Sequence, residues 1–172
     1  YDILLVKLDY LGNVIWKKVY RMGVTGITFS PNTEPRKIIP MPDGGFTVVG
    51  FTNAYSSTQS DIIVFRVNSA GAVMWSFTYG SLNLNEQGES IVHNSPNLVL
   101  TGTRRSYSLA GPPDAFIMKI PEIGGAPVWT RRWDAANPTD AGYDIINSST
   151  GTTVSGFAVT GYTERPVFGN DL

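Results

Sequence analysis

The sequence of 172 residues contains no cysteine. This absence excludes disulfide bridges, thiolate metal sites and a cysteine nucleophile. Charged residues are also scarce, at 16% of the chain against roughly 25% in an average soluble domain, and the formal net charge is only -1. Nothing in this balance attracts nucleic acid or anionic lipid as a whole. A polar surface built mainly from Ser, Thr, Asn and Gly is common in secreted and cell-surface β-proteins, so we expect an extracellular location.

Long apolar runs and helical periodicity are missing too. No apolar run approaches the roughly 20 residues that span a bilayer, so we expect no membrane insertion. The sequence itself contains no signal-peptide pattern, but it opens at Tyr1 in a strand-like run, and we interpret it as a mature or partial chain. No segment has the 3.6-residue period of a long amphipathic helix, and we expect under about a tenth of the residues to be helical.

What the sequence does contain is an internal repeat. Three segments start with Asp, continue as an apolar strand and reach a Trp after a glycine turn, with Trp spacings of 59 and 54 residues. They begin at Asp2, Asp61 and Asp114 and end at Trp16, Trp75 and Trp129. A glycine near the end of an apolar strand forms a second set of anchors, spaced by 52 and 59 residues, at Gly50, Gly102 and Gly161. Two sets of anchors with one order and period predict an array of repeated units, and this period is typical of propeller blades.

Each repeat reads as four short strands, A to D. Strand A is weakly marked, strand B ends near the glycine, strand C follows the Asp and strand D carries the Trp, with turn residues such as Asp43-Gly44-Gly45 between them. The predicted organisation is one module. Its parts are strands C and D at 1–20, a second repeat at about 36–80, a third at about 88–134 and final strands A and B at about 142–163.

The predicted fold is therefore all-β, with about three four-stranded propeller-type repeats that form an incomplete or oligomer-completed propeller. Three blades are too few for the usual ring of four to eight, and unpaired blade edges invite pairing with another chain. The chain starts in strand C and stops at Asp171-Leu172 in the opening of another. We expect further blades of the same protein, or other copies of the chain, to contact the termini at Tyr1 to Trp16 and Tyr162 to Leu172.

The pattern of Asp, apolar strand and Asp-x-x-Gly-Asn-x-x-Trp at Asp2 to Trp16, with Asp-Gly-Gly-Phe-x-x-x-Gly-x-Thr at Asp43 to Thr52, resembles the β-propeller repeats of secreted and surface-anchored bacterial and archaeal proteins. The resemblance covers nearly the whole chain and weakens in the third repeat, at Pro121 and Gly124-Gly125. It implies an architectural or binding role with no defined reaction. The Gly-x-x-x-Trp element is also loosely similar to quinoprotein-type propeller repeats, whose cofactor ligands have no match here.

The repeated aromatic and glycine residues have structural interpretations. We expect Trp16, Trp75 and Trp129 to be buried between sheets at equivalent positions, although an aromatic face also suits a sugar ring. The repeated glycines are expected where a side chain would crowd a neighbouring strand. Trp133 falls outside the repeat in this alignment and is the better candidate for a surface aromatic.

Candidate chemistry is sparse, and we expect neither enzymatic activity nor a cofactor. His93 is the only histidine, and no nucleophile-elbow motif accompanies it. Weak calcium candidates are Asp134, Asp140 and Asp144, whose spacing does not match an EF-hand. Candidate ligand contacts, from cations interleaved with aromatics, are Arg104, Arg105, Tyr107 and Trp133.

The sequence thus favours an extracellular structural or interaction module, as part of a scaffold, surface layer or filament that binds protein. The alternative is a carbohydrate-binding propeller with glycan sites between blades. An enzyme built on a larger propeller is a third hypothesis, and nucleic-acid binding is not expected.

Overall fold

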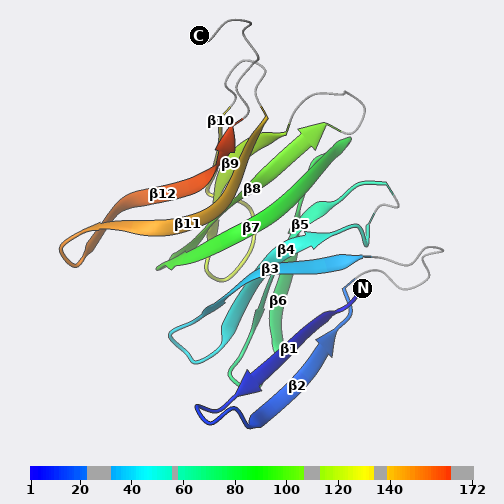
Figure 1. Ribbon diagram of the computed structural model, residues 1–172, viewed down its shortest axis with the longest axis vertical. Coiled ribbons are helices and arrows are strands. Elements are labelled where there is room, and N and C mark those ends of the chain that lie inside the picture. The colour runs from blue at the N-terminus through cyan, green and yellow to red at the C-terminus, as the bar shows by residue number, and fades with distance from the viewer. Residues whose placement is uncertain (23–31, 56–57, 107–112, 134–138, 164–172) are drawn as a thin grey trace, which may run out of the picture.

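The computed structural model describes residues 1–22, 32–55, 58–106, 113–133 and 139–163. Within these ranges the regular structure is twelve β-strands, arranged in four antiparallel sheets, and there is no helix. The all-β prediction is therefore confirmed. The sheets follow one another along the molecule, with the hairpin of the first two strands at one end (Figure 1).

The two middle sheets have four strands each and the two outer sheets have two. The first sheet contains β1 (Ile3–Leu8) and β2 (Val14–Tyr20). The second contains β3 (Thr33–Pro40), β4 (Phe46–Thr52), β5 (Asp61–Val67) and β6 (Val73–Tyr79). The third contains β7 (Leu84–Asn94), β8 (Asn97–Ser106), β9 (Asp114–Pro121) and β10 (Trp129–Trp133). The fourth contains β11 (Asp140–Thr150) and β12 (Thr153–Thr163).

The first strand of each later sheet begins earlier than the sequence predicted. β3 begins at Thr33, β7 at Leu84 and β11 at Asp140, where we expected starts at about 36, 88 and 142. After Leu84, the opening residues of β7 are polar and lack a strand-like apolar alternation, but they pair with β8, with Glu86 opposite Arg104. Backbone pairing to a neighbour therefore extends these strands beyond what side-chain pattern indicates.

The two four-stranded sheets share one register between their second and third strands. Gly50 lies opposite Ile63 in the second sheet, and Gly102 lies opposite Phe116 in the third. Each partner comes two residues after an Asp, at Asp61 or Asp114. The repeated Asp and Gly residues thus occupy corresponding positions in the second and third sheets.

A tight turn of the same kind joins the last two strands of the first and second sheets. In the β1–β2 turn, Asp9 accepts hydrogen bonds from the backbone N–H groups of Leu11 and Asn13, at 2.9 and 2.8 Å. Asn68 accepts the same pair of bonds, from Ala70 and Ala72, in the β5–β6 turn. Gly12 and Gly71 have φ values of 87° and 74° in these turns, a backbone region where a Cβ atom is unfavourable.

The hydrophobic core lies between successive sheets. Because side chains alternate along a strand, β5 uses Ile63 and Phe65 to contact the first sheet and Ile62 and Val64 to contact the third. All four residues are essentially inaccessible to solvent. A third, smaller cluster joins the third sheet to the fourth and contains Ile145. Strands covered on both faces explain the near-continuous apolar runs in the sequence.

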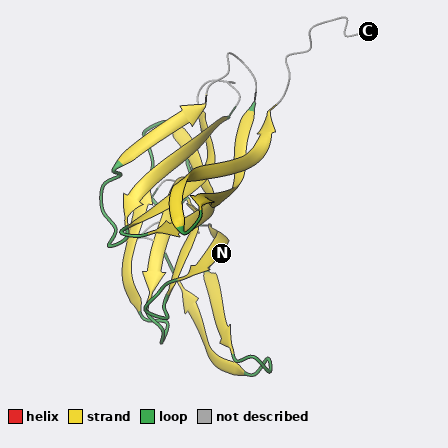
Figure 2. Ribbon diagram, turned by 90° about the vertical axis from the view of Figure 1, so that its left-hand side faces the viewer, coloured by secondary structure: helices red, strands yellow, loops and turns green. Residues whose placement is uncertain are grey.

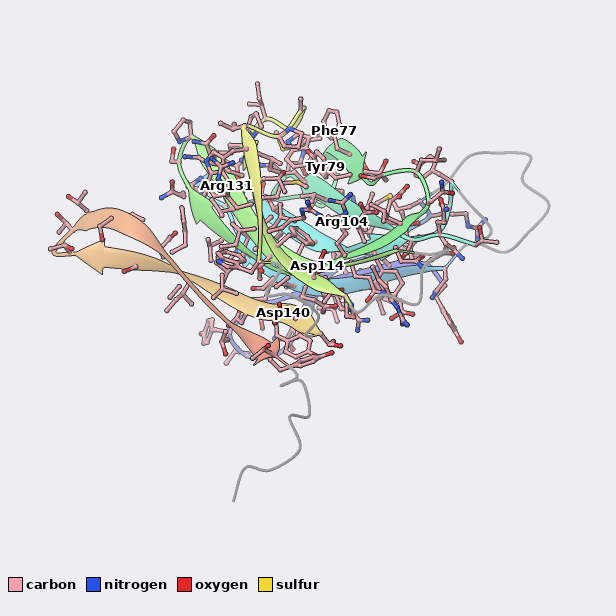
Figure 3. The ribbon with its side chains drawn as sticks, turned by 90° about the horizontal axis from the view of Figure 1, so that it is seen from above. Phe77, Tyr79, Arg104, Asp114, Arg131 and Asp140 are labelled. Carbon is pink, nitrogen blue, oxygen red and sulfur yellow. The ribbon has the colours of Figure 1, made fainter. Side chains whose placement is uncertain are left out.

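The outer sheets are each covered on one face only. The β1–β2 hairpin extends beyond the neighbouring strands at one end (Figure 2). The distal half of the β11–β12 hairpin projects away from the other sheets (Figure 3), and its residues around Gly151 are exposed. The two outer hairpins therefore present faces and edges that have no counterpart in the middle of the molecule.

Candidate functional site

The most regular chemistry in the molecule lies at the junctions between sheets. At the first junction, the Tyr20 hydroxyl donates a hydrogen bond to the carbonyl of Gly71 at 2.7 Å, and the Trp16 indole N–H donates to the carbonyl of Ser69 at 3.1 Å. At the second, the Tyr79 hydroxyl donates to the carbonyl of Gly125 at 2.9 Å. The last strand of one sheet thus holds the last turn of the next sheet through an aromatic side chain.

A backbone hydrogen bond also joins each pair of successive sheets at the opposite end of their junction. The N–H of Glu86 donates to the carbonyl of Ser60 at 2.8 Å, just before β5. The corresponding bonds at the other junctions are Thr33 N–H to Tyr1 at 3.1 Å and Asp140 N–H to Pro113 at 2.8 Å. The three donor residues are all buried polar residues. Each sheet therefore docks onto the previous one with the same geometry.

The three repeated tryptophans lie at corresponding positions in β2, β6 and β10, but they are half-buried and not fully buried as we predicted. Their strands are the outermost of each sheet, so one side of the indole faces solvent. Trp75 packs against Gly124 of the next sheet and against Phe77, whose ring centroid lies 5.8 Å away. Trp129 packs on the third cluster and carries Arg131 over its ring at 5.9 Å.

Trp133 corrects a second prediction, because it does not fall outside the pattern. It follows Trp129 by four residues, as Tyr20 follows Trp16 and Tyr79 follows Trp75. Its position is that of the aromatic that reaches the next turn. Trp133 is 49% exposed, whereas Tyr20 and Tyr79 are each 8% exposed. The difference arises because no third turn covers Trp133 among the described residues.

An apolar cavity of about 400 Å³ lies beside Trp133. Its walls are Ala115 and Ile117 of β9 on one side and Phe157, Val159 and Gly161 of β12 on the other. At the preceding junction, the corresponding volume is filled by side chains of β9 such as Phe116 and Met118. The cavity beside Trp133 thus lies where β9 lies at the preceding junction.

The repeated glycines and aspartates have distinct surroundings. A Cβ atom at Gly50, Gly102 or Gly161 would overlap the backbone oxygen of the adjacent first strand, at Glu34, Gln87 and Ala141 respectively. Among the aspartates, Asp2 forms an ion pair with Arg21 at 3.3 Å and Asp114 with Arg132 at 3.8 Å. Asp61 lies tightly against Gly80, and its burial raises the pKa of its carboxyl group.

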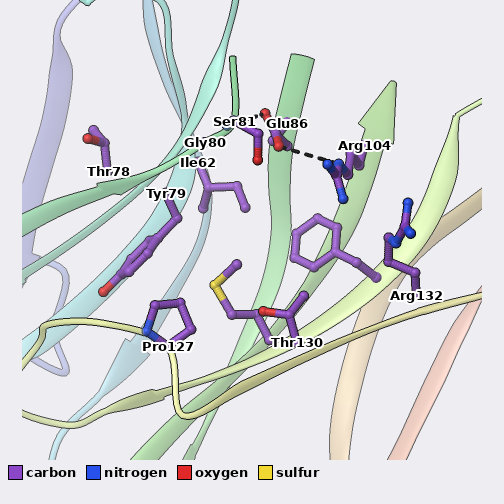
Figure 4. A pocket seen from close by; sticks show the side chains of 12 residues that line it. Ile62, Thr78, Tyr79, Gly80, Ser81, Glu86, Arg104, Pro127, Thr130 and Arg132 are labelled. Carbon is purple, nitrogen blue, oxygen red and sulfur yellow. Dashed lines mark hydrogen bonds and ion pairs between the residues drawn. The ribbon is translucent and has the colours of Figure 1, made fainter. Parts of the chain in front are cut away.

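A second cavity, of about 390 Å³, lies between the second and third sheets (Figure 4). Tyr79, Glu86 and Arg104 line it. Glu86 is 4% exposed, and its burial raises the pKa of its carboxyl group although Arg104 lies 3.6 Å away. Arg104 is therefore a partner of a buried carboxylate and does not project freely toward a ligand.

A polar groove of about 540 Å³ runs along the first strands of the sheets. Arg105 lines it, together with Asn85, Glu89 and two tyrosines. The rings of Tyr143 and Tyr162 lie 5.6 Å apart at a tilt of 39°. Arg104, Arg105 and Trp133, which were candidate ligand contacts, thus line three different hollows, and Tyr107 lies outside the described residues.

His93 belongs to an ion-pair network between sheets. Its Nε2 lies 2.8 Å from Glu122, and Glu122 also pairs with Arg66 at 3.1 Å. Arg66 in turn pairs with Asp43 at 2.9 Å. The hydrogen bond with His93 is the largest cause of a lowered pKa at Glu122. This arrangement contains no nucleophile and links the β3–β4 turn, β5 and the third sheet.

The calcium candidates do not converge in the described part of the chain. Asp140 begins β11, Asp144 accepts a hydrogen bond from Ser90 and pairs with Lys37 at 3.3 Å, and Asp134 lies outside the described residues. Within the described ranges, no group of three His, Asp or Glu residues could hold a metal ion. No described helix is long and apolar enough to cross a membrane.

The junction tyrosines were missed at the sequence level. The signal that identifies them is the spacing of four residues between the repeated Trp and a second aromatic, at Trp16 and Tyr20, Trp75 and Tyr79, and Trp129 and Trp133. Comparison with known proteins adds no family to this description, because no family model and no curated protein matches the chain.

Proposed function

We propose that this chain is a structural and interaction module of an extracellular or cell-surface protein, built from β-propeller-type blades and joined to protein partners through its two open ends. The observation that carries the proposal is a change in exposure at corresponding positions. Ile63, Phe65 and Val67 of β5 are at most 1% exposed. Leu4, Val6 and Leu8 of β1, at the same distances from their Asp, are 49%, 43% and 51% exposed.

Exposed apolar side chains at both ends support a joining role. Contiguous apolar patches of this kind mark protein-binding surfaces on soluble proteins. The opposite end carries the cavity beside Trp133, and the open edge of β12 exposes a row of backbone groups that can pair with another strand. The scarcity of charge and the resemblance to surface-protein propeller repeats support the extracellular setting. The proposed role needs no catalysis and no cofactor.

Binding of an apolar dye to the native chain tests this function. Anilinonaphthalene sulfonate should fluoresce with the folded chain at concentrations too low for copies to associate, and the serine variants Val6→Ser and Trp133→Ser should each lower that signal. Val73→Ser is the matched control, because Val73 is 50% exposed on a strand of the middle of the molecule. Equal signals from all three variants would contradict the assignment of the ends as joining surfaces.

Carbohydrate binding is the second candidate function, and the polar groove favours it. Two exposed tyrosine rings beside amide, carboxylate and guanidinium groups resemble what a sugar requires, since a ring face suits a pyranose and polar groups bind its hydroxyls. Tyr143 is 52% exposed and Tyr162 is 41% exposed. The groove is formed by β3, β7, β8 and the fourth sheet, and it shares Ala141 and Tyr162 with the cavity beside Trp133.

A glycan array separates the two functions. The structural proposal expects no retained glycan. The carbohydrate function expects binding that Tyr143→Ala abolishes and that Tyr55→Ala preserves, because Tyr55 is equally exposed, at 54%, outside the groove.

A further inference from the structure

The two outer hairpins are complementary halves of one four-stranded sheet. In the middle sheets the second strand pairs with the third, as β4 with β5 and β8 with β9. In the described residues β12 occupies the second-strand position and pairs only with β11, while β1 occupies the third-strand position and pairs only with β2. Each open edge therefore lacks the kind of strand that the other supplies.

The register of such a pairing follows from the middle sheets. There the glycine of the second strand lies opposite the residue two places after the Asp, and both sheets agree along the whole strand pair. Transferred to the outer hairpins, this register places Gly161 opposite Leu4 and Val159 opposite Val6. The corresponding pairs in the middle sheets are Val48 with Phe65 and Leu100 with Met118.

The faces match as well as the edges. In this register Leu4, Val6 and Leu8 enter the volume beside Trp133, where Phe116, Met118 and Ile120 stand at the preceding junction. Phe157 and Val159 are half-buried in the chain alone, whereas their counterparts Leu98 and Leu100 are 0% exposed.

The β1–β2 turn also matches the turns that the aromatic side chains bind at the junctions between sheets. The β1–β2 turn has the same backbone hydrogen bonds as the β5–β6 turn, from residue 9 to 13 and from residue 68 to 72. Tyr20 binds the carbonyl of Gly71 in that second turn. By correspondence, the Trp133 indole N–H reaches the carbonyl of Gly12, and Trp129 that of Tyr10.

We propose that the β1–β2 hairpin of a second copy of this chain docks on β12 in this register. This inference rests on the function proposed above and names its partner. Such a head-to-tail contact between copies gives a closed ring when the rotation fits and a filament when it does not.

Cysteine cross-linking tests the docking, and the absence of native cysteine makes the result unambiguous. The variants Val6→Cys and Val159→Cys are purified separately, mixed, allowed to exchange and oxidised. Directly opposed antiparallel residues have Cβ atoms about 4.5–5.5 Å apart, close to the range of a disulfide. The mixture should yield a covalent dimer, and each variant alone should remain a single chain on a non-reducing gel.

The control for register pairs Val6→Cys with Ser155→Cys, because residue 155 lies about 14 Å from residue 159 along a strand. Sedimentation equilibrium of the unmodified chain should give a mass above 18.7 kDa that rises with concentration, and Trp133→Ser should weaken this association at least tenfold. Equal cross-linking in the control mixture, or a mass that stays at 18.7 kDa at every concentration, would overturn the proposal.

Failure of this inference is distinguishable from failure of the proposed function. A chain that stays monomeric but binds the apolar dye at both ends retains the joining surfaces and lacks the second copy as partner. A monomer that does not bind the dye contradicts both the joining surfaces and the docking of a second copy. A dimer that forms normally with Trp133→Ser, without cross-linking of residues 6 and 159, uses a different surface and refutes the docking.

Discussion

Replacing Tyr79 by Phe tests the aromatic contact that recurs between sheets. The substitution removes only the hydroxyl that donates to the carbonyl of Gly125 at 2.9 Å, and it keeps the ring, which is 8% exposed within the main core cluster. A hydrogen bond of this kind contributes about 1 kcal/mol net. Gly125 is only half-buried, so water can satisfy its carbonyl and the loss should not exceed this value. The melting temperature should fall by about 2–4 °C.

The same variant separates the ionisation of the Tyr79 hydroxyl from that of the other tyrosines. Burial raises the pKa of Tyr79 to about 12, against an ordinary tyrosine value near 10. Because the folded state favours the neutral phenol, the stabilisation is fully present below pH 10 and is lost as the pH rises through about 12. The difference between the ultraviolet titrations of the native chain and Tyr79→Phe should therefore have its midpoint near 12. A midpoint near 10 in the folded protein would refute the burial of the phenol, and a melting temperature unaffected by the substitution would refute the contribution of the hydrogen bond.

Three further substitutions address the anchors and the polar network. Trp75→Ala should lower the free energy of unfolding by about 2–3 kcal/mol in denaturant melts, less than for a fully buried Trp because the ring is half-exposed; a loss of ligand binding at unchanged stability would favour a sugar platform. Gly102→Val should destabilise the fold strongly, since its Cβ overlaps the Gln87 backbone oxygen, whereas an unchanged melt would mean that the backbone shifts freely. Glu122 has a lowered pKa, so its contribution is present above the ordinary pKa of 4.5 and is lost as the pH falls through the lower folded value. Glu122→Gln should therefore flatten the acid side of a stability–pH curve, and an identical acid limb would show that the pairing of Glu122 with His93 and Arg66 contributes nothing.

The strands and turns could be predicted because their causes are local. Strands depend on alternating apolar residues. Turns depend on a glycine with positive φ and on an Asp or Asn that accepts hydrogen bonds from nearby N–H groups. These residues are close together in the sequence, as at Asp9 to Asn13. The crowding at the repeated glycines also followed, since a Cβ atom at Gly50 or Gly102 would overlap the backbone of the neighbouring strand. These features depend on short-range geometry, which one sequence displays directly.

The junction contacts could not be predicted in the same way. Whether the Trp75 indole faces another sheet or solvent depends on which strand is outermost, and sequence spacing does not reveal this. Trp133 looked irregular because the repeated aromatic at its position is Tyr in the other two sheets. Glu86 and Asp140 read as loop residues because their burial arises only when one sheet docks on the next.

The recurrence of one junction has a thermodynamic consequence for the ends. When each sheet contacts only its neighbours, stability is approximately the sum of sheet and junction contributions. A middle sheet has two junctions, but each outer hairpin has one, and an isolated two-stranded sheet is marginal in water. The amides of β1 and β12 should therefore exchange with solvent faster than those of β5 and β8. Docking of a strand at either end adds the missing junction to the folded state alone, so it stabilises the outer hairpins by mass action. Protection of β1 and β12 that rises with protein concentration is the signature that distinguishes this coupling from intrinsic rigidity of the hairpins.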